Sequence, residues 1–222
     1  MPETTRISKL GFVNCYLVRE DDGLTLVDTM LPRSAQKILA EAQRLGAPIR
    51  RIVLTHAHGD HIGSLDELHE LLPEAEVIIS ARDARLLSKD LSLDPGEPHR
   101  KPRGSLPGAK TPPSRTVNEG DMVGSLEVIA TPGHTPGHVA LLDPRDGTLL
   151  CGDAYATLGG VATSAKSSPL FPLPGLATWH KPTALESARK LCGLQVLRLA
   201  PGHGQIVQSP LEAMRAAVAR GA

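Results

Sequence analysis

The stretch "LTHAHGDHIGSLDEL" (residues 54–68) places three histidines and one aspartate within six consecutive positions. An apolar run precedes it and apolar residues spaced three apart follow it, which predicts that the cluster lies where a strand ends and a helix begins. In an extended segment alternate side chains share a side, so His56, His58 and Asp60 are expected to point one way. His61, next to Asp60, then points differently. This spacing suits two adjacent metal ions better than one.

Each of these side chains also has an ordinary structural interpretation. Asp60 lies at the predicted helix start, where an aspartate often serves only as an N-cap. Taken singly, each residue is better explained by structure, whereas the four together favour a metal site. Two other histidines, His69 beside an apolar helical stripe and His99 in a proline-rich segment, are expected at the surface.

Three further candidate ligands follow predicted strands in the second half of the chain: His134 in "TPGHTPGH", Asp153 in "CGDA" and His203 in "APGHG". His134 and His203 both follow a "PG" pair, and glycine lets the backbone turn tightly enough to aim an imidazole inward. His138 begins an apolar run and is expected to be a packed or hydrogen-bonded strand residue rather than a ligand. The sequence therefore supplies enough ligands for a second metal.

The rest of the chain reads as strands and helices in alternation, which predicts sheets covered by helices. Strands are expected at 14–18, 24–28, 51–55, 76–80, 126–130, 138–142, 148–152 and 196–200, and helices at 33–45, 61–72, 81–88, 182–192 and 210–219. A proline-rich segment at 90–118 is expected to form a long loop that covers the site. A second stretch rich in proline and glycine spans 157–177.

Composition narrows the classes of function. A chain of 222 residues suits one domain, spanning 1–222. Lys plus Arg and Asp plus Glu both total 24 and aromatic residues are 2%, so the chain has neither an overall positive charge nor many stacking platforms for nucleic acid. It contains no apolar run long enough to span a membrane and no recognisable secretory signal, so a cytoplasmic location is expected. The three cysteines, Cys15, Cys151 and Cys192, form no C-x-x-C pair, which argues against a disulfide framework.

The combined pattern of ligand residues resembles the metallo-β-lactamase superfamily of metallohydrolases, and the resemblance runs across nearly the whole chain. It is carried by seven residues: His56, His58, Asp60, His61, His134, Asp153 and His203. The resemblance implies an α/β fold, an αββα sandwich of two mixed sheets packed face to face, with helices outside and the metals at one edge. Asp28 in "TLVDT" is similar to an early aspartate of the family that supports the site.

The resemblance also implies a role for each ligand. The first metal would take His56, His58 and His134, the second Asp60, His61 and His203, and Asp153 would bridge the two. Zinc is the expected ion, and iron or manganese accept the same ligands. A hydroxide between two such ions would be the nucleophile, and Asp60 would orient it and pass a proton to the leaving group.

Departures from particular subfamilies narrow the choice of hydrolase. True metallo-β-lactamases generally lack the bridging aspartate that Asp153 supplies, and Cys151 is expected to face the opposite side of its strand. Flavodiiron proteins carry glutamate where this chain has His58. Glyoxalase II enzymes add a helical C-terminal domain, whereas 19 residues follow His203 here. No basic segment suggests the RNA-gripping arm of the nuclease members.

Single-domain lactonases keep all seven ligands and place a tyrosine three positions after the bridging aspartate. Tyr155 follows Asp153 by two positions, so it is either a catalytic group that supports the carbonyl oxygen or a tyrosine of the strand end or pocket wall. Pocket walls are expected from residues 90–118 and 155–181. The side chains proposed for these walls are Tyr155, Phe171, Trp179 and His180.

The sequence thus favours a binuclear metal-dependent hydrolase of small carboxylic esters, thioesters or lactones. A mononuclear-iron persulfide dioxygenase shares the same motifs and uses part of the ligand set. A metal-binding protein without catalysis is a third alternative, which the intact ligand set disfavours. The expected partner is a small-molecule substrate, with a homodimer also considered and neither nucleic acid nor membrane.

Overall fold

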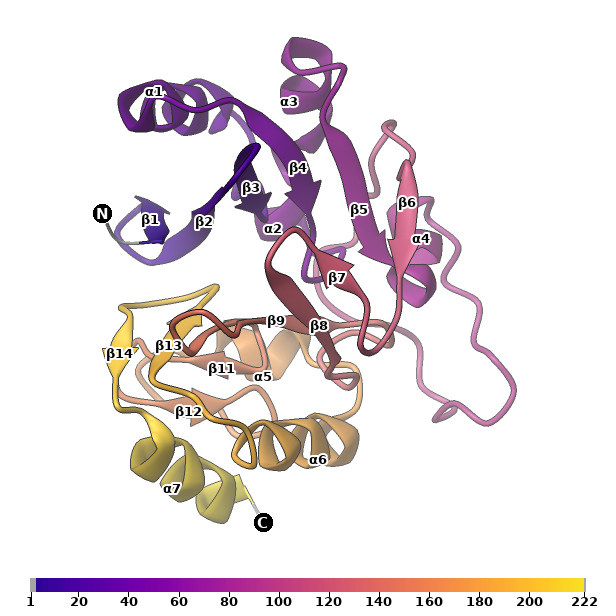
Figure 1. The fold of residues 1–222 in the computed structure, drawn as a ribbon. Coiled ribbons are helices and arrows are strands. Elements are labelled where there is room, and N and C mark those ends of the chain that lie inside the picture. Colours follow the sequence, from indigo (N-terminus) through magenta and orange to yellow (C-terminus); the bar gives the residue numbers. More distant parts are fainter. Residues whose placement is uncertain (1–2, 222) are drawn as a thin grey trace.

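Two six-stranded sheets pack face to face, and helices cover the outer face of each (Figure 1). The computed structural model describes residues 3–221. The strand order is β1-β2-β3-β4-β5-β6 in the first sheet and β14-β13-β10-β9-β8-β7 in the second. Each sheet contains both parallel and antiparallel pairs. The predicted αββα sandwich of two mixed sheets is therefore confirmed, while the assignment of 1–222 to one domain stays a prediction.

The first half of the chain forms the first sheet and its helices. Its strands are β1 (Thr4–Lys9), β2 (Val13–Glu20), β3 (Gly23–Val27), β4 (Ile49–Val53), β5 (Glu76–Ser80) and β6 (Arg115–Val117). Its helices are α1 (Ala35–Leu45), α2 (Gly59–Ile62), α3 (Leu65–Leu71) and α4 (Ala81–Leu87). Strands β3 to β6 run parallel to one another.

The second half forms the other sheet. Its strands are β7 (Met122–Val123), β8 (Leu126–Ala130), β9 (Val139–Asp143), β10 (Thr148–Gly152), β13 (Arg198–Pro201) and β14 (Val207–Gln208). The remaining elements are the pair β11 (Tyr155–Ala156) and β12 (Ala162–Thr163), and the helices α5 (Leu173–Ala177), α6 (Lys181–Leu191) and α7 (Leu211–Gly221). None of the helices in residues 3–221 is both long and apolar enough to span a bilayer.

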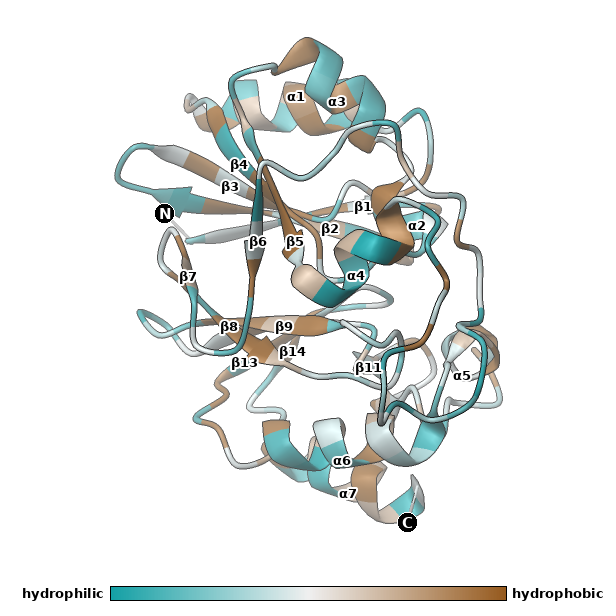
Figure 2. Ribbon diagram, turned by 90° about the vertical axis from the view of Figure 1, so that its right-hand side faces the viewer, coloured by the Kyte–Doolittle hydropathy of each residue, from teal (hydrophilic) through white to brown (hydrophobic). Residues whose placement is uncertain are grey.

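The core has three layers because successive side chains of a strand face opposite ways. In β3 and β4, Val27 and Val53 pack between the two sheets, whereas Leu26 and Ile52 face the layer beneath the first sheet's helices. A third layer lies between the second sheet and helices α6 and α7. Figure 2 shows the resulting apolar strands between more polar helix surfaces.

The topology brings candidate site residues to one edge, since parallel strands end at the same side of a sheet. Asp28 follows β3, His56 follows β4 and Asp83 follows β5 in the first sheet. In the second sheet β10 and β13 are parallel, and Asp153 and His203 follow them. Residues distant in sequence therefore meet where the two sheets face each other.

The helix predicted at 61–72 was wrong in one respect, because it is broken into α2 and α3 at Gly63. The chain that follows β3 packs against this point: the Gly63 amide donates to the Met30 carbonyl over 2.8 Å. A side chain at Gly63 would meet the backbone nitrogen of Pro32 at 2.5 Å. The extended path also ends at His58, so Asp60 lies in the first turn of α2 rather than on an extended segment.

The segment expected as a loop at 90–118 has no helix or strand from 90 to 114, but β6 occupies Arg115–Val117 within its predicted bounds (Figure 1, the magenta trace). Hydrogen bonds fix it at several points along its length. The Trp179 indole donates to the Arg100 carbonyl, and the Ala109 amide donates to the Leu87 carbonyl over 2.9 Å. Near its end, the carboxylate of Asp66 accepts two backbone amides of this segment. These hydrogen bonds hold residues 90–118 against the rest of the protein, and we call them the cover segment.

Gly133 offers a test of how tightly the β8–β9 loop packs on α6. Its φ is +127°, and a Cβ there would lie 2.2 Å from the Ala184 backbone nitrogen. Gly120 has a φ of +83° and open space around it. Alanine there would therefore suffer the backbone strain of a positive φ but no clash with a neighbouring atom. We expect Gly133→Ala to lower the free energy of unfolding by about 1–3 kcal/mol more than Gly120→Ala. Urea unfolding measures the difference, and equal effects would contradict this packing.

Candidate metal centre

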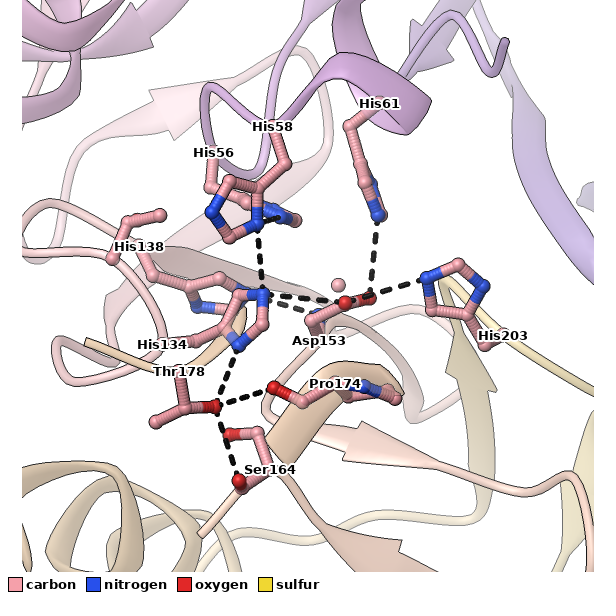
Figure 3. Close-up of polar contacts among 12 residues, drawn as sticks. His56, His58, His61, His134, His138, Asp153, Ser164, Pro174, Thr178 and His203 are labelled. Carbon is pink, nitrogen blue, oxygen red and sulfur yellow. Dashed lines mark hydrogen bonds and ion pairs between the residues drawn. The ribbon is translucent and has the colours of Figure 1, made fainter. Parts of the chain in front are cut away.

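Three imidazole rings from two sheets converge at the edge described above (Figure 3). His56 and His58 lie in the chain after β4, and His134 lies in the loop between β8 and β9. The Nε2 atom of His56 is 3.1 Å from Nδ1 of His58, which is 3.0 Å from Nε2 of His134. Nitrogen ligands of tetrahedral zinc stand roughly 3.3–3.4 Å apart, given bonds of about 2.0–2.1 Å. The three atoms are therefore spaced for one ion.

Hydrogen bonds behind His134 determine which of its nitrogens carries the proton. Its Nδ1 is 3.0 Å from Oγ1 of Thr178. That hydroxyl has one proton, which it donates to the carbonyl oxygen of Pro174 (2.7 Å) or Ser164 (3.0 Å). Nδ1 of His134 must then be the donor to Thr178, so Nε2 carries a free lone pair towards the other two rings.

The same logic applies to His56 and His58. Nδ1 of His56 is 3.0 Å from Oγ1 of Thr55, whose proton goes to a carboxylate oxygen of Asp28 over 2.9 Å. Nε2 of His58 donates to the carbonyl of Arg103 over 2.8 Å. Both rings therefore present unprotonated nitrogens to the centre. Three lone pairs that face one another repel unless a cation lies between them.

A second group lies beside the first and includes Asp60, His61 and His203. Oδ1 of Asp153 is 3.3 Å from Nε2 of His61, and its Oδ2 is 3.3 Å from Nε2 of both His134 and His203. Oδ2 of Asp60 is 3.3 Å from the same nitrogen of His203. Asp153 thus stands between the two groups, as expected of a bridging ligand.

The pKa values of the histidines differ between the two groups because burial dominates in the first and neighbouring carboxylates dominate in the second. Burial lowers the pKa of His58 to about 3 and also lowers that of His56, so both rings are neutral at pH 7. Burial works against the charged form of His203 as well, but Asp153 and Asp60 outweigh it and raise its pKa to about 9. A neutral imidazole is the form that binds a metal, so ion binding at His203 displaces a proton.

Unpaired atoms provide an independent check that ions fit here. Within residues 3–221, Nε2 of His61 and Oδ1 of Asp153 are buried and make no well-formed hydrogen bond, and they face each other as an ion pair at 3.3 Å. His61 is bonded through Nδ1 to Asp28 over 2.8 Å, so a neutral His61 directs the lone pair of Nε2 at this carboxylate oxygen, and a divalent cation between the two atoms would satisfy both. Three sets of residues each place their ligand atoms within 4.8 Å of one another. They are His56, His58 and His134; His56, His61 and Asp153; and Asp60, His61 and His203.

Three other histidines, His138, His99 and His69, do not belong to the ligand groups. His138 is buried, shares a hydrogen bond with Thr131 and accepts the backbone amide of Asp153 over 3.0 Å. It is the hydrogen-bonded residue that the sequence predicted, and it positions Asp153. His99 is exposed and His69 is half-buried, and neither belongs to a ligand group.

The catalytic role considered for Tyr155 is corrected by its position. Its ring is fully buried in the layer between the second sheet and α6, and its hydroxyl donates to the Ala188 carbonyl over 2.7 Å. The chain reverses after β10 in a turn closed by the Ala154 amide and the Cys151 carbonyl, so Tyr155 points away from Asp153. Cys151 lies in the same apolar layer, on the side away from the metal centre as predicted.

Only one of the other proposed wall residues lines the inner cavity beside the metal centre. Phe171 packs edge-on against Phe12 and lies 5.2 Å, centroid to centroid, from the ring of His203. Trp179 instead holds the cover segment, and His180 caps the start of α6.

The inner cavity has a volume of about 90 Å³. It is lined by Phe12, His58, Asp60, Ser105, Asp153, Phe171, Leu173, Pro174, Ala177 and His203. A larger hollow of about 670 Å³ lies between residues 159–169 and α7 and includes none of the seven ligand candidates.

Sequence reasoning missed Asp83, a buried carboxylate that joins the loop after β4 to the loop between β8 and β9. It accepts the Ala57 amide (3.1 Å), the Thr135 hydroxyl (2.7 Å) and the Gly137 amide (2.7 Å). Burial raises its pKa, although these donors oppose the shift. The sequence signal around it was an acid three residues after Ser80, which indicates a helix start and is not specific to a metal site.

Comparisons with known proteins agree with this geometry. Residues 8–203 match the family described as "Metallo-beta-lactamase superfamily", and the chain belongs to it. It is 46% identical to the uncharacterized protein YobT of Bacillus subtilis (strain 168), over 93% of this chain and 89% of that protein. It is 31% identical to the probable metallo-hydrolase YflN of the same organism, over 90% and 82%.

More distant matches extend the comparison. A hydroxyacylglutathione hydrolase of Thermosynechococcus vestitus (strain NIES-2133 / IAM M-273 / BP-1) is 31% identical over 65% of this chain, but the match spans only 50% of that enzyme. The crystal structure of TTHA1623 in a di-iron-bound form superimposes with a TM-score of 0.68 at 28% identity, covering 94% of this chain and 96% of that one. Family membership confirms the prediction of a hydrolase.

Thr178 provides a test of the hydrogen bond behind His134. Thr178→Val removes the acceptor for Nδ1 and leaves the ring free to turn or change tautomer, so we expect metal affinity to fall about 10–100-fold. Thr178→Ser keeps the hydroxyl and should retain affinity within a few-fold. Competition with a chromogenic chelator measures both. Equal affinity in the two variants would show that this bond does not position His134.

Proposed function

We propose that this protein is a binuclear metal-dependent hydrolase of small carboxylic esters, thioesters or lactones. The observation that carries the proposal is the pair of adjacent ligand groups that meet at Asp153. His56, His58 and His134 would hold one ion, and Asp60, His61 and His203 the other. When bound, two divalent ions at such a site polarise a carbonyl oxygen and activate water at neutral pH.

Zinc is our proposal for the metal, because nitrogen and carboxylate ligands in this spacing suit it. Iron and manganese accept the same ligands, and the similar structure of TTHA1623 holds two irons. The second set of ligand atoms, from Asp60, His61 and His203, lies outside the three-histidine group and favours two ions. This is the feature that disfavours the mononuclear persulfide dioxygenase.

Asp60 is the residue best placed to manage protons. Its side chain is 34% exposed, more than the other ligand candidates named in its contacts, and it lines the inner cavity. Burial opposes its ionisation, but His203 and His61 outweigh burial and keep its pKa well below its usual range. It is therefore a carboxylate at pH 7, and its position beside the cavity, rather than its lowered pKa, favours a role in proton transfer.

The reaction that follows is hydrolysis with one proton relayed. Oxygen from water forms a bond to the acyl carbon, and the bond from that carbon to the leaving oxygen or sulfur breaks. The Asp60 carboxylate takes the proton released by the attacking water and returns it to the leaving atom. A carboxylic acid and an alcohol or thiol result, and Asp60 ends as it began.

A small substrate fits the dimensions and charge of the site. The cavity beside the ligands has a volume of about 90 Å³, and a chain with balanced charge has no overall positive field to attract a polyanion. Relatives named hydroxyacylglutathione hydrolases support an acyl group as the reacting part. A cytoplasmic location is part of the proposal and follows from the sequence expectation alone.

Metal analysis and a substrate panel test the proposal together. Protein purified without added ions should contain close to two metals per chain, whereas one iron would favour the dioxygenase. In a panel of lactones, aryl esters, thioesters, β-lactams, phosphodiesters and glutathione persulfide, we expect the highest kcat/KM on carboxylic esters, thioesters or lactones. Rapid oxygen consumption with the persulfide, or a lead for phosphodiesters, would overturn it.

Asp60→Asn separates proton transfer from substrate binding. The amide keeps the shape of the side chain but cannot accept and return a proton. We expect kcat to fall by about 10²–10⁴-fold, with KM changing much less. Metal content is measured in parallel, and the result counts only at equal occupancy. A variant with full metal and unchanged kcat would remove Asp60 from the mechanism.

A further inference from the structure

A groove opens on the surface beside the inner cavity. Its volume is about 600 Å³, within the range of sites for small molecules. Most of its lining is apolar and comes from Leu31, Pro32, Pro107, Leu173, Leu176 and Ala177. Asp60 is the one charged side chain among its lining residues. An apolar group is therefore the chemistry that this surface accommodates.

The groove is continuous with the inner cavity, because Asp60, Ser105, Leu173 and Ala177 line both. The inner cavity, at about 90 Å³, has room for a few groups the size of water. It can accept a reacting carboxyl group but not an extended substituent. The remainder of any larger substrate has to leave the cavity, and the groove provides an exit past Asp60.

The groove wall formed by α5 presents two leucines to solvent. Leu173 and Leu176 are 57% and 59% exposed, and their spacing of three places them on one face of the helix. The end of this helix is attached to the metal centre, since Nδ1 of His134 is 3.0 Å from Oγ1 of Thr178 and the Trp179 amide donates to the His134 carbonyl over 3.0 Å. The wall is thus formed before any ligand arrives.

The position of Asp60 sets the direction in which the substrate lies. A group that returns a proton must approach the leaving atom to about 2.6–3.2 Å. The leaving atom therefore lies beside Asp60, at the junction of cavity and groove, and what is attached to it extends into the groove. The acyl carbon lies deeper, towards Asp153 and His203.

We infer that the groove binds an apolar chain carried by the leaving group, so that preferred substrates are esters or thioesters of an alkyl alcohol or thiol. This assignment rests on the proposed function. Binding of each methylene in the groove raises kcat/KM by about two- to fourfold, the upper value corresponding to full burial. Lengthening the acyl chain brings no such gain.

Two ester series that share ethyl acetate distinguish the two ends of the substrate. In one series the alcohol grows from ethyl to hexyl acetate, and in the other the acid grows from ethyl acetate to ethyl hexanoate. A pH-stat measures kcat/KM for each. We expect kcat/KM to rise by about two- to fourfold for each methylene added to the alcohol, and by less than about twofold for each methylene added to the acid. A steeper rise along the acid series would overturn the inference.

Variants locate the effect in the groove. The double variant Leu173→Ser/Leu176→Ser should flatten the alcohol series. Leu170→Ser is the matched control, because Leu170 is 81% exposed and does not line the groove, and it should keep the wild-type slope. An unchanged slope in the double variant would place the chain elsewhere and overturn the assignment.

A binding measurement separates failure of this inference from failure of the proposed function. Fluorine NMR of trifluorohexanol should show line broadening with wild-type protein and Leu170→Ser, and much less with the double variant. If no ester is hydrolysed but this pattern holds, the groove assignment survives and the proposed function falls. If esters are hydrolysed but neither chain length nor the double variant matters, the inference falls and the hydrolase stands.

Discussion

The metal centre depends on hydrogen bonds made behind the imidazole rings. Thr55, Thr178 and the Arg103 carbonyl each fix one ring by its outer nitrogen, so the inner nitrogens of His56, His134 and His58 face one another unprotonated. Burial keeps the rings of His56 and His58 neutral by lowering their pKa values. Mutual repulsion of lone pairs makes this arrangement unfavourable unless the scaffold enforces it, and a cation turns the same arrangement into a favourable one.

Two buried carboxylates, those of Asp28 and Asp83, position the segments that carry these rings. Asp28 accepts the amide of Thr55 and faces His61, so it links the ends of β3 and β4. Asp83 accepts groups from the loops on both sides of the sandwich, including those of Ala57 and Gly137. The relative placement of the two sheets is thereby fixed at the edge where the ligands meet. The apolar layer between the sheets supplies the stability, and these carboxylates supply the alignment.

The strand–helix alternation and the ligand cluster could be predicted because both leave strong local patterns, whereas the sandwich of two sheets was implied only by the resemblance to a known family. Alternating apolar runs mark the central strands, and four ligand-type residues in six positions have no common structural explanation. The supporting groups leave weaker patterns. Asp83 resembles a helix cap, and Thr178 is one threonine in a stretch rich in proline and glycine. Of the two interpretations left open for Tyr155, the catalytic one is wrong because the turn after β10 places the side chain in the layer behind the second sheet. Such turns depend on tertiary packing.

The cover segment joins specificity to metal binding. Its Arg103 carbonyl holds His58, and its Ser105 carbonyl accepts the Gly59 amide over 2.9 Å, while Ser105 also lines the groove. Between them, Gly104 passes so close that a Cβ would lie 2.5 Å from Nε2 of His58. A change that reshapes this wall for another substrate therefore also moves a metal ligand.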